Sequence, residues 1–322
     1  MDFATTLSGN EPIAITIGNF DGIHRGHQRL LHELGAVAQS LRCKPVIVTF
    51  SPHTLLVVKP NVQLDCLTTL EEKLALAKSY GKVADNIVIH FTPEVAALSA
   101  GAFLDELRAH FRIQAMVVGN DFSLGHNRMG DIPFLQRYAQ EHHIHVLPIE
   151  LEEAERARIS STRIRSLVSE GQIIDANELL GHPVVVSGII VKGDQRGRLL
   201  GFPTANLLPE AHKLLPMNGV YAAYVQIEHA PESDAPDQLP VSYTQNEWNS
   251  VVNIGVRPTF GGQQRMVEAH LLDVQLDLYG QRITIDFMAR LRNEQRFSSI
   301  DALKTQIAAD AQQARLLLQK GG

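Results

Sequence analysis

The fold of the first half of this chain is decided by residues 13–27, which read IAITIGNFDGIHRGH in one-letter code. The first five residues are apolar or β-branched and predict a buried strand, and a helical pattern follows the last histidine. Between them, three glycines let the backbone approach a phosphate, the helix N-terminus offers N–H groups, and His24 and His27 can donate hydrogen bonds. The segment predicts a phosphate site, although histidines that only cap and fill the turn are an alternative.

Four further apolar runs, separated by helical patterns, extend this first strand into a larger domain. Together they predict a doubly wound α/β fold on a parallel sheet. A capping box of Thr68 with Glu71 is expected before a helix that ends at Gly81, and Asp131 is expected to cap a later helix. The expected strands are residues 12–17, 45–50, 86–91, 113–118 and 144–149.

The pattern changes after residues 161–180, which are helical and interrupted by Gly171. The breaker Gly181-His182-Pro183 predicts a boundary between a domain of residues 1–182 and a domain of residues 183–322.

Beyond this boundary, strand patterns follow one another without crossover helices, which predicts a small antiparallel barrel. A capping box of Ser298 with Asp301 predicts one long terminal helix against it. Prolines within residues 229–249 predict a surface loop. The expected barrel strands are residues 184–192, 220–227, 251–255, 267–273 and 282–291.

Composition narrows the class of protein. The 322 residues include 29 Lys and Arg against 35 Asp and Glu, a formal net charge of −6, with 44% apolar and 20% charged residues. These values are typical of folded domains, and the acidic balance argues against a nucleic-acid partner. Without a membrane span or a secretory signal, we expect a cytoplasmic protein. Its two cysteines, Cys43 and Cys66, exclude a disulfide framework and a thiolate zinc site.

Two more segments of the first half can face an anion. Residues 159–165 read ISSTRIR at a helix start and can clamp a triphosphate, the alternative being a plain cap with solvated arginines. The loop 119–131 follows the fourth expected strand, where open α/β sheets bind ligands, and its Asp121 suits ribose hydroxyls or an adenine edge. The clamp would consist of Ser161, Thr162, Arg163 and Arg165.

In this order and spacing, the three segments resemble the FMN adenylyltransferase half of the bacterial bifunctional riboflavin kinase/FAD synthetase family. The resemblance implies a Rossmann-like nucleotidyltransferase domain in which FMN phosphate attacks the α-phosphate of ATP, while His24 and His27 stabilise the phosphates. The segment FSPH is similar to a family segment near the flavin and assigns Pro52 and His53, although Thr54 replaces a common proline. The implied nucleotide-binding residues are Gly18, Asn19, Phe20, Gly22, Gly26, Asp121, Ser161, Thr162, Arg163 and Arg165.

Residues 188–206, the densest glycine segment, suggest a second nucleotide site. Glycines let a loop wrap a nucleotide, and Thr204 and Asn206 supply oxygens that Mg²⁺ accepts, the alternative being a glycine-rich barrel corner. This stretch resembles the riboflavin kinase signature of the same family. Three further segments that resemble it are residues 218–222, 252–260 and 267–273.

The kinase resemblance implies a six-stranded riboflavin kinase-like barrel with Glu268 as the catalytic base, which accepts a proton while the riboflavin hydroxyl attacks the γ-phosphate of ATP. Thr204 and Asn206 would also bind Mg²⁺, and Arg292 and Glu294 would bind the flavin. The implied nucleotide-binding residues are Gly193, Gly197, Gly201, Pro203, Thr204 and Asn206. The chain departs from the family pattern at His182 and Arg290.

The whole resemblance implies an enzyme that phosphorylates riboflavin to FMN and adenylylates FMN to FAD. Its partners would be riboflavin, FMN, FAD, ATP, ADP and pyrophosphate, with Mg²⁺ in both steps, and we expect a monomer or weak homo-oligomer. Two alternatives stay open, a nucleotidyltransferase for another phosphate compound and a flavin or nucleotide sensor without turnover. The histidine-rich residues 141–145 and Trp248 are interpreted as surface and packing residues.

Overall fold

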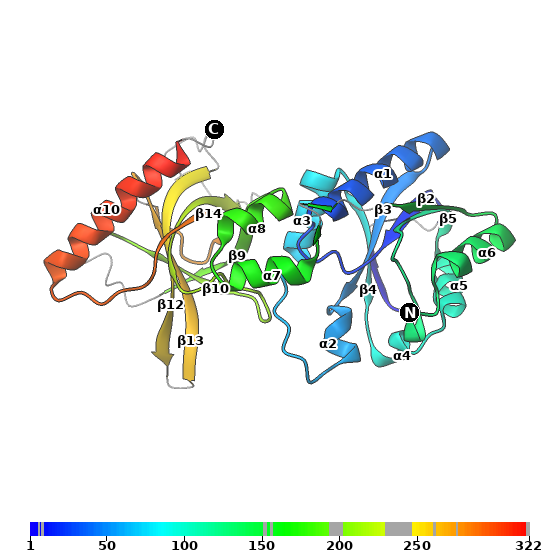
Figure 1. Ribbon diagram of the computed structural model, residues 1–322, viewed down its shortest axis with the longest axis horizontal. Helices are drawn as coiled ribbons and strands as arrows, with labels where there is room; N and C mark the ends of the chain where they lie inside the picture. Colours follow the sequence, from blue (N-terminus) through cyan, green and yellow to red (C-terminus); the bar gives the residue numbers. More distant parts are fainter. Residues whose placement is uncertain are drawn as a thin grey trace, which may run out of the picture. The chain divides into compact units, whose positions relative to one another are not determined.

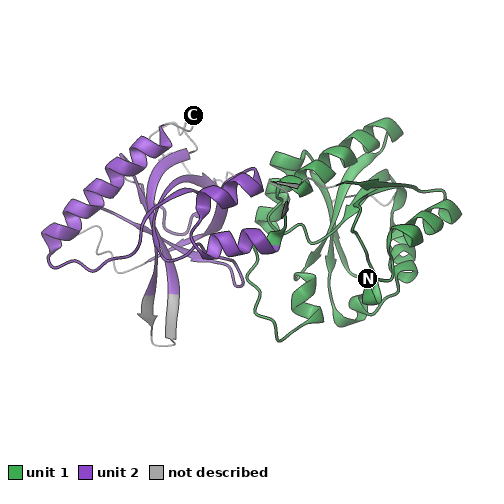
Figure 2. Cartoon of the chain, in the orientation of Figure 1, with its two compact units in different colours: residues 1–161 green, residues 162–322 purple. Residues whose placement is uncertain are grey.

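The computed structural model divides by its contacts into two compact units, Met1–Ser161 and Thr162–Gly322 (Figure 2). This division describes contacts, so the predicted domain boundary at residues 181–183 stays a prediction. The structure describes residues 1–5, 7, 10–150, 153–154, 157–192, 202–228, 247–259, 262–274 and 276–319.

The main sheet of the first unit consists of β1 (Phe3–Thr5), β2 (Pro12–Ile17), β3 (Lys44–Ser51), β4 (Asp85–His90), β5 (Arg112–Gly119) and β6 (His145–Ile149). The strand order is β1-β4-β3-β2-β5-β6 (Figure 1). From β4 to β6 all neighbours are parallel, and β1 pairs antiparallel with β4. The predicted parallel sheet is confirmed, and β1 is a short edge strand that the sequence pattern missed.

The strand order reverses between β2 and β5, so the carboxyl ends of these strands flank the crevice where doubly wound sheets bind ligands. Residues 18–27 follow β2, and residues 120–131 follow β5. The fold therefore brings two of the predicted anion segments to the same edge of the sheet.

Helices are held on the sheet by burial of apolar surface. Ile15, Val48 and Ile89 of the strands share one buried core with Leu104 and Leu107. The helices of this unit are α1 (Arg25–Leu41), α2 (Thr54–Val58), α3 (Leu70–Gly81), α4 (Pro93–Ala96), α5 (Ala100–His110), the 3-10 helix η1 (His126–Arg128) and α6 (Ile132–His142). A two-stranded ribbon, β7 (Glu153–Ala154) with β8 (Ala157–Arg158), follows.

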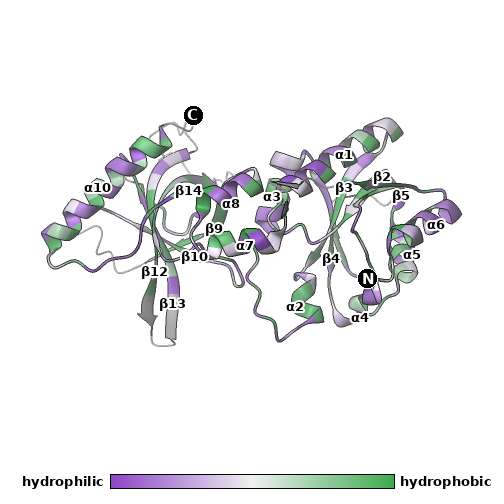
Figure 3. Cartoon of the chain, viewed as in Figure 1, coloured by the Kyte–Doolittle hydropathy of each residue, from purple (hydrophilic) through white to green (hydrophobic). Residues whose placement is uncertain are grey.

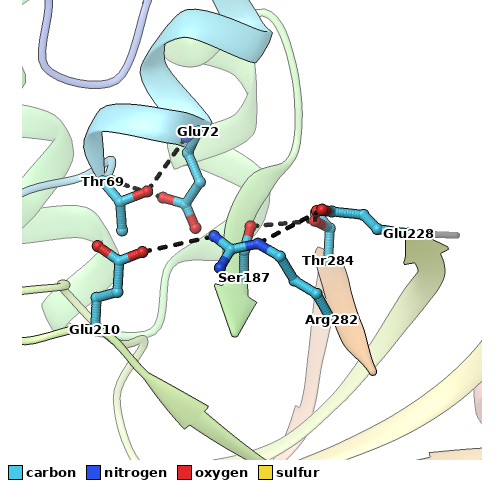
Figure 4. A network of polar contacts seen from close by, with 7 residues as sticks. All are labelled: Thr69, Glu72, Ser187, Glu210, Glu228, Arg282 and Thr284. Carbon is cyan, nitrogen blue, oxygen red and sulfur yellow. Dashed lines mark hydrogen bonds and ion pairs between the residues drawn. The ribbon is translucent and has the colours of Figure 1, made fainter. Parts of the chain in front are cut away.

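The helix caps agree with the sequence in kind but not always in position. The predicted capping box of Thr68 with Glu71 is wrong by one residue. Thr69 accepts a hydrogen bond from the N–H of Glu72 at 3.2 Å, and the Glu72 carboxylate accepts one from the N–H of Thr69 at 2.9 Å (Figure 4). Thr68 cannot cap α3 because its own N–H and hydroxyl bond to the turn after β2. Asp131 caps α6 as predicted.

The second unit begins at Thr162, within α7 (Ser161–Ser169), and holds α8 (Ile173–Leu180) and the barrel strands β9 (Val184–Val191), β10 (Ala205–Pro209), β11 (Gly219–Glu228), β12 (Glu247–Thr259), β13 (Gly262–Leu271) and β14 (Arg282–Arg292). These strands close a barrel in the order β10-β13-β12-β11-β14-β9, and all pairs are antiparallel. The predicted six-stranded barrel is confirmed. Of the predicted loop 229–249, residues 229–246 lie outside the described residues, and 247–249 belong to β12.

The barrel interior is filled by large side chains. Tyr221 and Phe287 are fully buried and meet edge to face with ring centroids 5.4 Å apart. On the surface, Arg282 of β14 lies 3.5 Å from the carboxylates of both Glu228 of β11 and Glu210, which follows β10 (Figure 4). Such exposed ion pairs contribute little to stability, so the packed interior holds the barrel together.

Hydrophobic and hydrophilic residues both occur along the terminal helix α10 (Ile300–Leu318) (Figure 3), and its Ala311, Ala314 and Leu318 pack on the barrel. The predicted capping box of Ser298 with Asp301 is wrong, because Ser299 is the N-cap and accepts from the N–H of Ala302 at 3.1 Å, and the alanine side chain cannot return a bond.

One ion pair fastens α10 to β14. The guanidinium of Arg292 donates from Nη2 to Oδ2 of Asp310 at 2.7 Å and from Nε to Oδ1 at 3.0 Å. Gln306 donates to the same carboxylate at 2.8 Å. Asp310 is 3% exposed, so removal of its carboxylate would leave a partly buried guanidinium without this partner.

We therefore expect Asp310→Ala to lower the free energy of unfolding by about 3 kcal/mol, because breaking a buried pair leaves one charge uncompensated. Asp301→Ala, on the exposed first turn of the same helix, should change it by less than about 1 kcal/mol. Urea unfolding followed by circular dichroism measures both. Equal stability losses in the two variants would contradict this role of the ion pair.

Candidate functional site

Residues 18–27, called here the histidine turn, connect β2 to the first turn of α1. His24 is the N-cap of α1, and its Nδ1 accepts a hydrogen bond from the N–H of His27 at 3.4 Å. Because Nδ1 is the acceptor, the neutral ring carries its proton on Nε2 and can donate from that atom. The side chain is buried, so the ring has a fixed direction.

The ring of His27 stacks on that of His24, with centroids 3.6 Å apart and planes inclined by 16°, and the ring of Phe20 meets it at 5.2 Å. The buried Nδ1 of His27 has no hydrogen-bond partner among the described residues. Burial, then the charges of His24 and Lys73, holds the pKa of His27 well below its ordinary value, so the ring is neutral at pH 7. An unpaired buried nitrogen is costly until a ligand supplies a partner.

A side chain in place of Gly26 would press on the His24 ring of this stack. A Cβ at this position would lie 3.3 Å from two atoms of the His24 ring, closer than side chains normally pack. Gly22 adopts a φ of +87°, and Phe20 a φ of +50°, which bends the turn back toward α1. Gly18 donates its N–H to the Val48 carbonyl at 3.0 Å. These glycines thus build the turn itself, in addition to any room they give a phosphate.

Asn19 connects the turn to the segment predicted to lie near the flavin. Its Oδ1 accepts from the N–H of Thr54 at 3.2 Å, and its Nδ2 donates to the Thr54 hydroxyl at 2.8 Å. Neither bond could form with a proline at position 54, which explains how threonine fits where the family often has proline. The adjacent His53 caps α2, accepting from the N–H of Leu55 at 3.1 Å, and Pro52 follows a cis peptide bond. The structure therefore brings Pro52 and His53 to the histidine turn.

The other two anion segments are placed differently. Asp121 is exposed just after β5, at the sheet edge that carries the turn. Ser161, the last residue of the first unit, donates its hydroxyl to the Asp21 carbonyl at 2.8 Å and so lies beside the histidine turn. Thr162, Arg163 and Arg165 belong to the second unit by contacts, and their role in clamping a triphosphate stays a prediction.

In the barrel, three polar residues lie side by side on neighbouring strands. Asn206 of β10 pairs with Glu268 of β13, which pairs on its other side with Asn253 of β12. Directly paired residues of antiparallel strands lie on one face, about 5 Å apart. The flanking pairs, such as Leu207 with Val267, are buried inside the barrel, so this polar row faces outward. The resemblance to the family had already assigned roles to Asn206 and Glu268. It assigned none to Asn253, whose place beside Glu268 follows from the strand register.

Asn206 is buried, and its Oδ1 has no hydrogen-bond partner among the described residues. Thr204 stands two residues earlier, half-buried, just before β10. The carbonyl of Pro203 lies 2.8 Å from Nδ1 of His270, which fixes this segment against β13. The predicted residues Gly193, Gly197 and Gly201 lie outside the described residues.

The two predicted flavin residues of the barrel unit are in different situations. Arg292 is held by the buried Asp310, so its guanidinium is already engaged in a structural ion pair. Glu294 lies over Gly255, where an added Cβ would overlap the Glu294 carboxylate and approach the Asn253 amide to 3.4 Å. Glu294 is therefore close to one end of the polar row, whereas Arg292 acts in fastening α10.

Comparison with known proteins finds a different family model in each half of the chain. A family model described as FAD synthetase matches residues 7–163, and one described as riboflavin kinase matches residues 180–318. The bifunctional riboflavin kinase/FMN adenylyltransferase of Escherichia coli (strain K12) is 38% identical over 306 residues, covering 95% of this chain and 92% of that protein. The protein of the same name from Pseudomonas fluorescens is 36% identical over 309 residues, covering 94% and 92%.

Among solved structures, a crystal structure of a Streptococcus pneumoniae protein described as a macrolide-efflux protein has a TM-score of 0.82 and 27% identity, covering 96% of each chain. This similarity supports the fold of the chain, and the description as an efflux protein applies to the Streptococcus pneumoniae protein alone. Within the residues that the structure describes, no helix is long and apolar enough to cross a membrane.

We expect Gly255→Ala to displace the Glu294 carboxylate and to weaken riboflavin binding about tenfold, since one hydrogen bond to a charged group contributes about 1.5 kcal/mol. Quenching of riboflavin fluorescence measures the affinity. Gly35→Ala adds the same methyl group where no atom lies within 4 Å and should leave the affinity unchanged. Unaltered binding in a folded Gly255→Ala protein would show that Glu294 does not contact the flavin.

Proposed function

Because this chain belongs to the bifunctional riboflavin kinase/FMN adenylyltransferase family, we propose that its two reactions occur at the histidine turn and at the polar row. The chain transfers the γ-phosphate of ATP to riboflavin, giving FMN and ADP, and the adenylyl group of ATP to FMN, giving FAD and pyrophosphate. Two separate sites are supported by the unpaired buried atoms in each unit, Nδ1 of His27 and Oδ1 of Asn206.

The riboflavin kinase match also decides between the functions that the sequence left open. A nucleotidyltransferase for an unrelated phosphate compound would have no use for a kinase over residues 180–318. A sensor would not need an enzyme's complete set of polar groups, and His24, His27, Thr204, Asn206 and Glu268 are all present.

At the histidine turn, a phosphate oxygen of FMN attacks the α-phosphorus of ATP, a P–O bond forms, and the bond to the pyrophosphate oxygen breaks. FMN phosphate is already ionised, so no side chain has to remove a proton from the nucleophile. Charge develops on the phosphoryl oxygens, where the Nε2 proton of His24, the neutral ring of His27 and the N–H groups at the start of α1 are available. The site acts by positioning and by hydrogen bonding.

We expect His27→Ala to lower FAD formation from FMN about 100-fold, the usual effect of removing one group that stabilises the transition state. Riboflavin phosphorylation should continue, so FMN accumulates. Chromatography of the flavins measures both, with His143→Ala, an exposed histidine at the end of α6, as control. Normal FAD formation in the His27→Ala protein would remove this histidine from the proposed site.

At the polar row, the Glu268 carboxylate accepts the proton of the riboflavin hydroxyl as the hydroxyl oxygen attacks the γ-phosphorus of ATP and ADP leaves. Its neighbours on both strands, Asn206 and Asn253, place polar groups on the same face. The outward-facing row lets two substrates approach a carboxylate that the filled barrel interior supports from behind.

Mg²⁺ fits the oxygen donors beside this row. The unpaired buried Oδ1 of Asn206 and the hydroxyl of Thr204 are the hard ligands that Mg²⁺ takes, together with phosphate oxygens and water. Bound there, the ion would neutralise charge on the ATP phosphates. The described residues hold no group of three or more His, Cys, Asp or Glu side chains that could bind a metal, so the substrate phosphates would supply much of the charge.

We expect Glu268→Gln to lower riboflavin phosphorylation at least about 100-fold, because the amide cannot accept the proton. FAD formation from supplied FMN should stay unchanged. Glu247→Gln, at an exposed position where β12 begins, is the control. A phosphorylation rate within a few-fold of the unmodified protein would contradict a general-base role for Glu268.

Three expectations from the sequence go with this proposal. The domain limits of residues 1–182 and 183–322, a monomeric or weakly associated state and a cytoplasmic location stay predictions.

A further inference from the structure

A lysine outside all the motifs that the sequence singled out lies beneath the histidine turn. Lys73 of α3 is 5% exposed, and its Nζ donates a hydrogen bond to Oγ1 of Thr49 at 3.1 Å. That hydroxyl in turn donates to the backbone carbonyl of Asn19 at 3.3 Å. A lysine is rarely buried unless a specific interaction requires it, because its charge loses hydration.

The residues just before Lys73 hold the opposite side of the turn. The hydroxyl of Thr68 accepts from the N–H of Gly22 at 3.1 Å, and its N–H donates to Oδ1 of Asp21 at 3.1 Å. Asp21 is 2% exposed, and its carboxylate partly offsets the lowering of the Lys73 pKa by burial. The region where α3 begins is therefore hydrogen-bonded to the histidine turn at several points. Thr68 bonds directly to Asp21 and Gly22, and Lys73 reaches Asn19 through Thr49.

We propose that Lys73 is a positioning residue for adenylyl transfer, which holds the backbone of Asn19 through Thr49 and keeps a buried positive charge beneath the bound phosphates. This inference rests on the proposed function of the histidine turn. The hydrogen-bonded path from Lys73 through Thr49 to Asn19 is called here the lysine relay. The side chain of Asn19 also forms two hydrogen bonds to Thr54. By holding Asn19, the relay therefore also positions the neighbouring segment of Pro52 and His53.

The charges around the relay are consistent with this role. Burial lowers the pKa of Lys73, while the nearby carboxylate of Asp21 and the thiol of Cys66 raise it. The lysine in turn lowers the pKa of His27, to which burial and His24 contribute as well. Loss of the ammonium group should therefore raise the pKa of His27, so that its ring takes up a proton at a higher pH.

A lysine that only stabilised the fold would be buried in the same way. The test therefore has to distinguish an effect on catalysis from an effect on stability. Lys73→Met removes the donor and the charge, Lys73→Gln keeps a donor without charge, and Thr49→Val breaks the relay while keeping the lysine. Lys78→Met, an exposed lysine on the same helix, is the control. The readouts are kcat and KM for FAD formation from FMN over a range of pH, with thermal unfolding of each variant.

Lys73→Met is expected to lower kcat for FAD formation about 100-fold, as small misplacements of reacting groups do, with little change in the KM for ATP. The double variant with Thr49→Val should be no slower than Lys73→Met alone, since both break one path. In Lys73→Met and Lys73→Gln, the loss of activity on acidification should begin at higher pH than in the unmodified chain, and in Thr49→Val it should not.

The inference is overturned by folded Lys73→Met and Lys73→Gln proteins with unchanged kcat and pH profile, or by rate losses that simply add in the double variant. If Lys73→Met does not fold, Lys73→Gln and Thr49→Val still decide it. Failure of the proposed function is recognised separately, because His27→Ala would then retain FAD formation. Activity lost in His27→Ala but not in the lysine variants would reject the relay alone.

Discussion

The hydrogen bond from the His27 N–H to Nδ1 of His24 is the interaction on which the adenylyl-transfer site depends. It begins α1, fixes which nitrogen of His24 carries the proton, and brings the two rings together. A Cβ at Gly26 would lie 3.3 Å from the His24 ring, which would have to shift to accept it. A change at any of these positions would alter both the helix cap and the groups offered to phosphate, so structure and chemistry at this turn cannot be varied separately.

In the barrel too, the interactions that stabilise the fold also fix the position of the reactive group. Its interior is filled by Tyr221 and Phe287, and polar groups are placed outward in register across β10, β13 and β12. A strand register cannot slip by one residue without turning Glu268 into the apolar interior. The packing that stabilises the barrel therefore also fixes the position of the carboxylate, while the Arg292–Asp310 pair holds the terminal helix in place.

Much of this was predictable from local sequence, and the failures have physical causes. Runs of apolar residues predicted ten strands of the sheet and the barrel. They missed β1 and β10, because both are short and β10 has prolines at or near both ends. Both predicted caps were wrong by one residue because two neighbouring hydroxyl residues could cap each helix. At α3, Thr68 bonds to Asp21 instead, and Thr69 forms the capping box with Glu72. At α10, Ser299 caps the helix without a capping box, since Ala302 has no polar side chain to return a bond. Arg292 matched a family segment near the flavin, but its ion-pair partner Asp310 lies on α10, so the sequence alone could not reveal the pair. Asn253 and Lys73 gained their significance only from register and long-range contacts.

The central claim is that the two reactions belong to two separate sets of residues. The most direct measurement mixes equal amounts of the Glu268→Gln and His27→Ala proteins with riboflavin, ATP and Mg²⁺ and follows the flavins by chromatography. Each protein alone should form little FAD, whereas the mixture should form it, because FMN made by one variant is adenylylated by the other. No FAD in the mixture, although Glu268→Gln converts supplied FMN and His27→Ala makes FMN, would contradict independent sites.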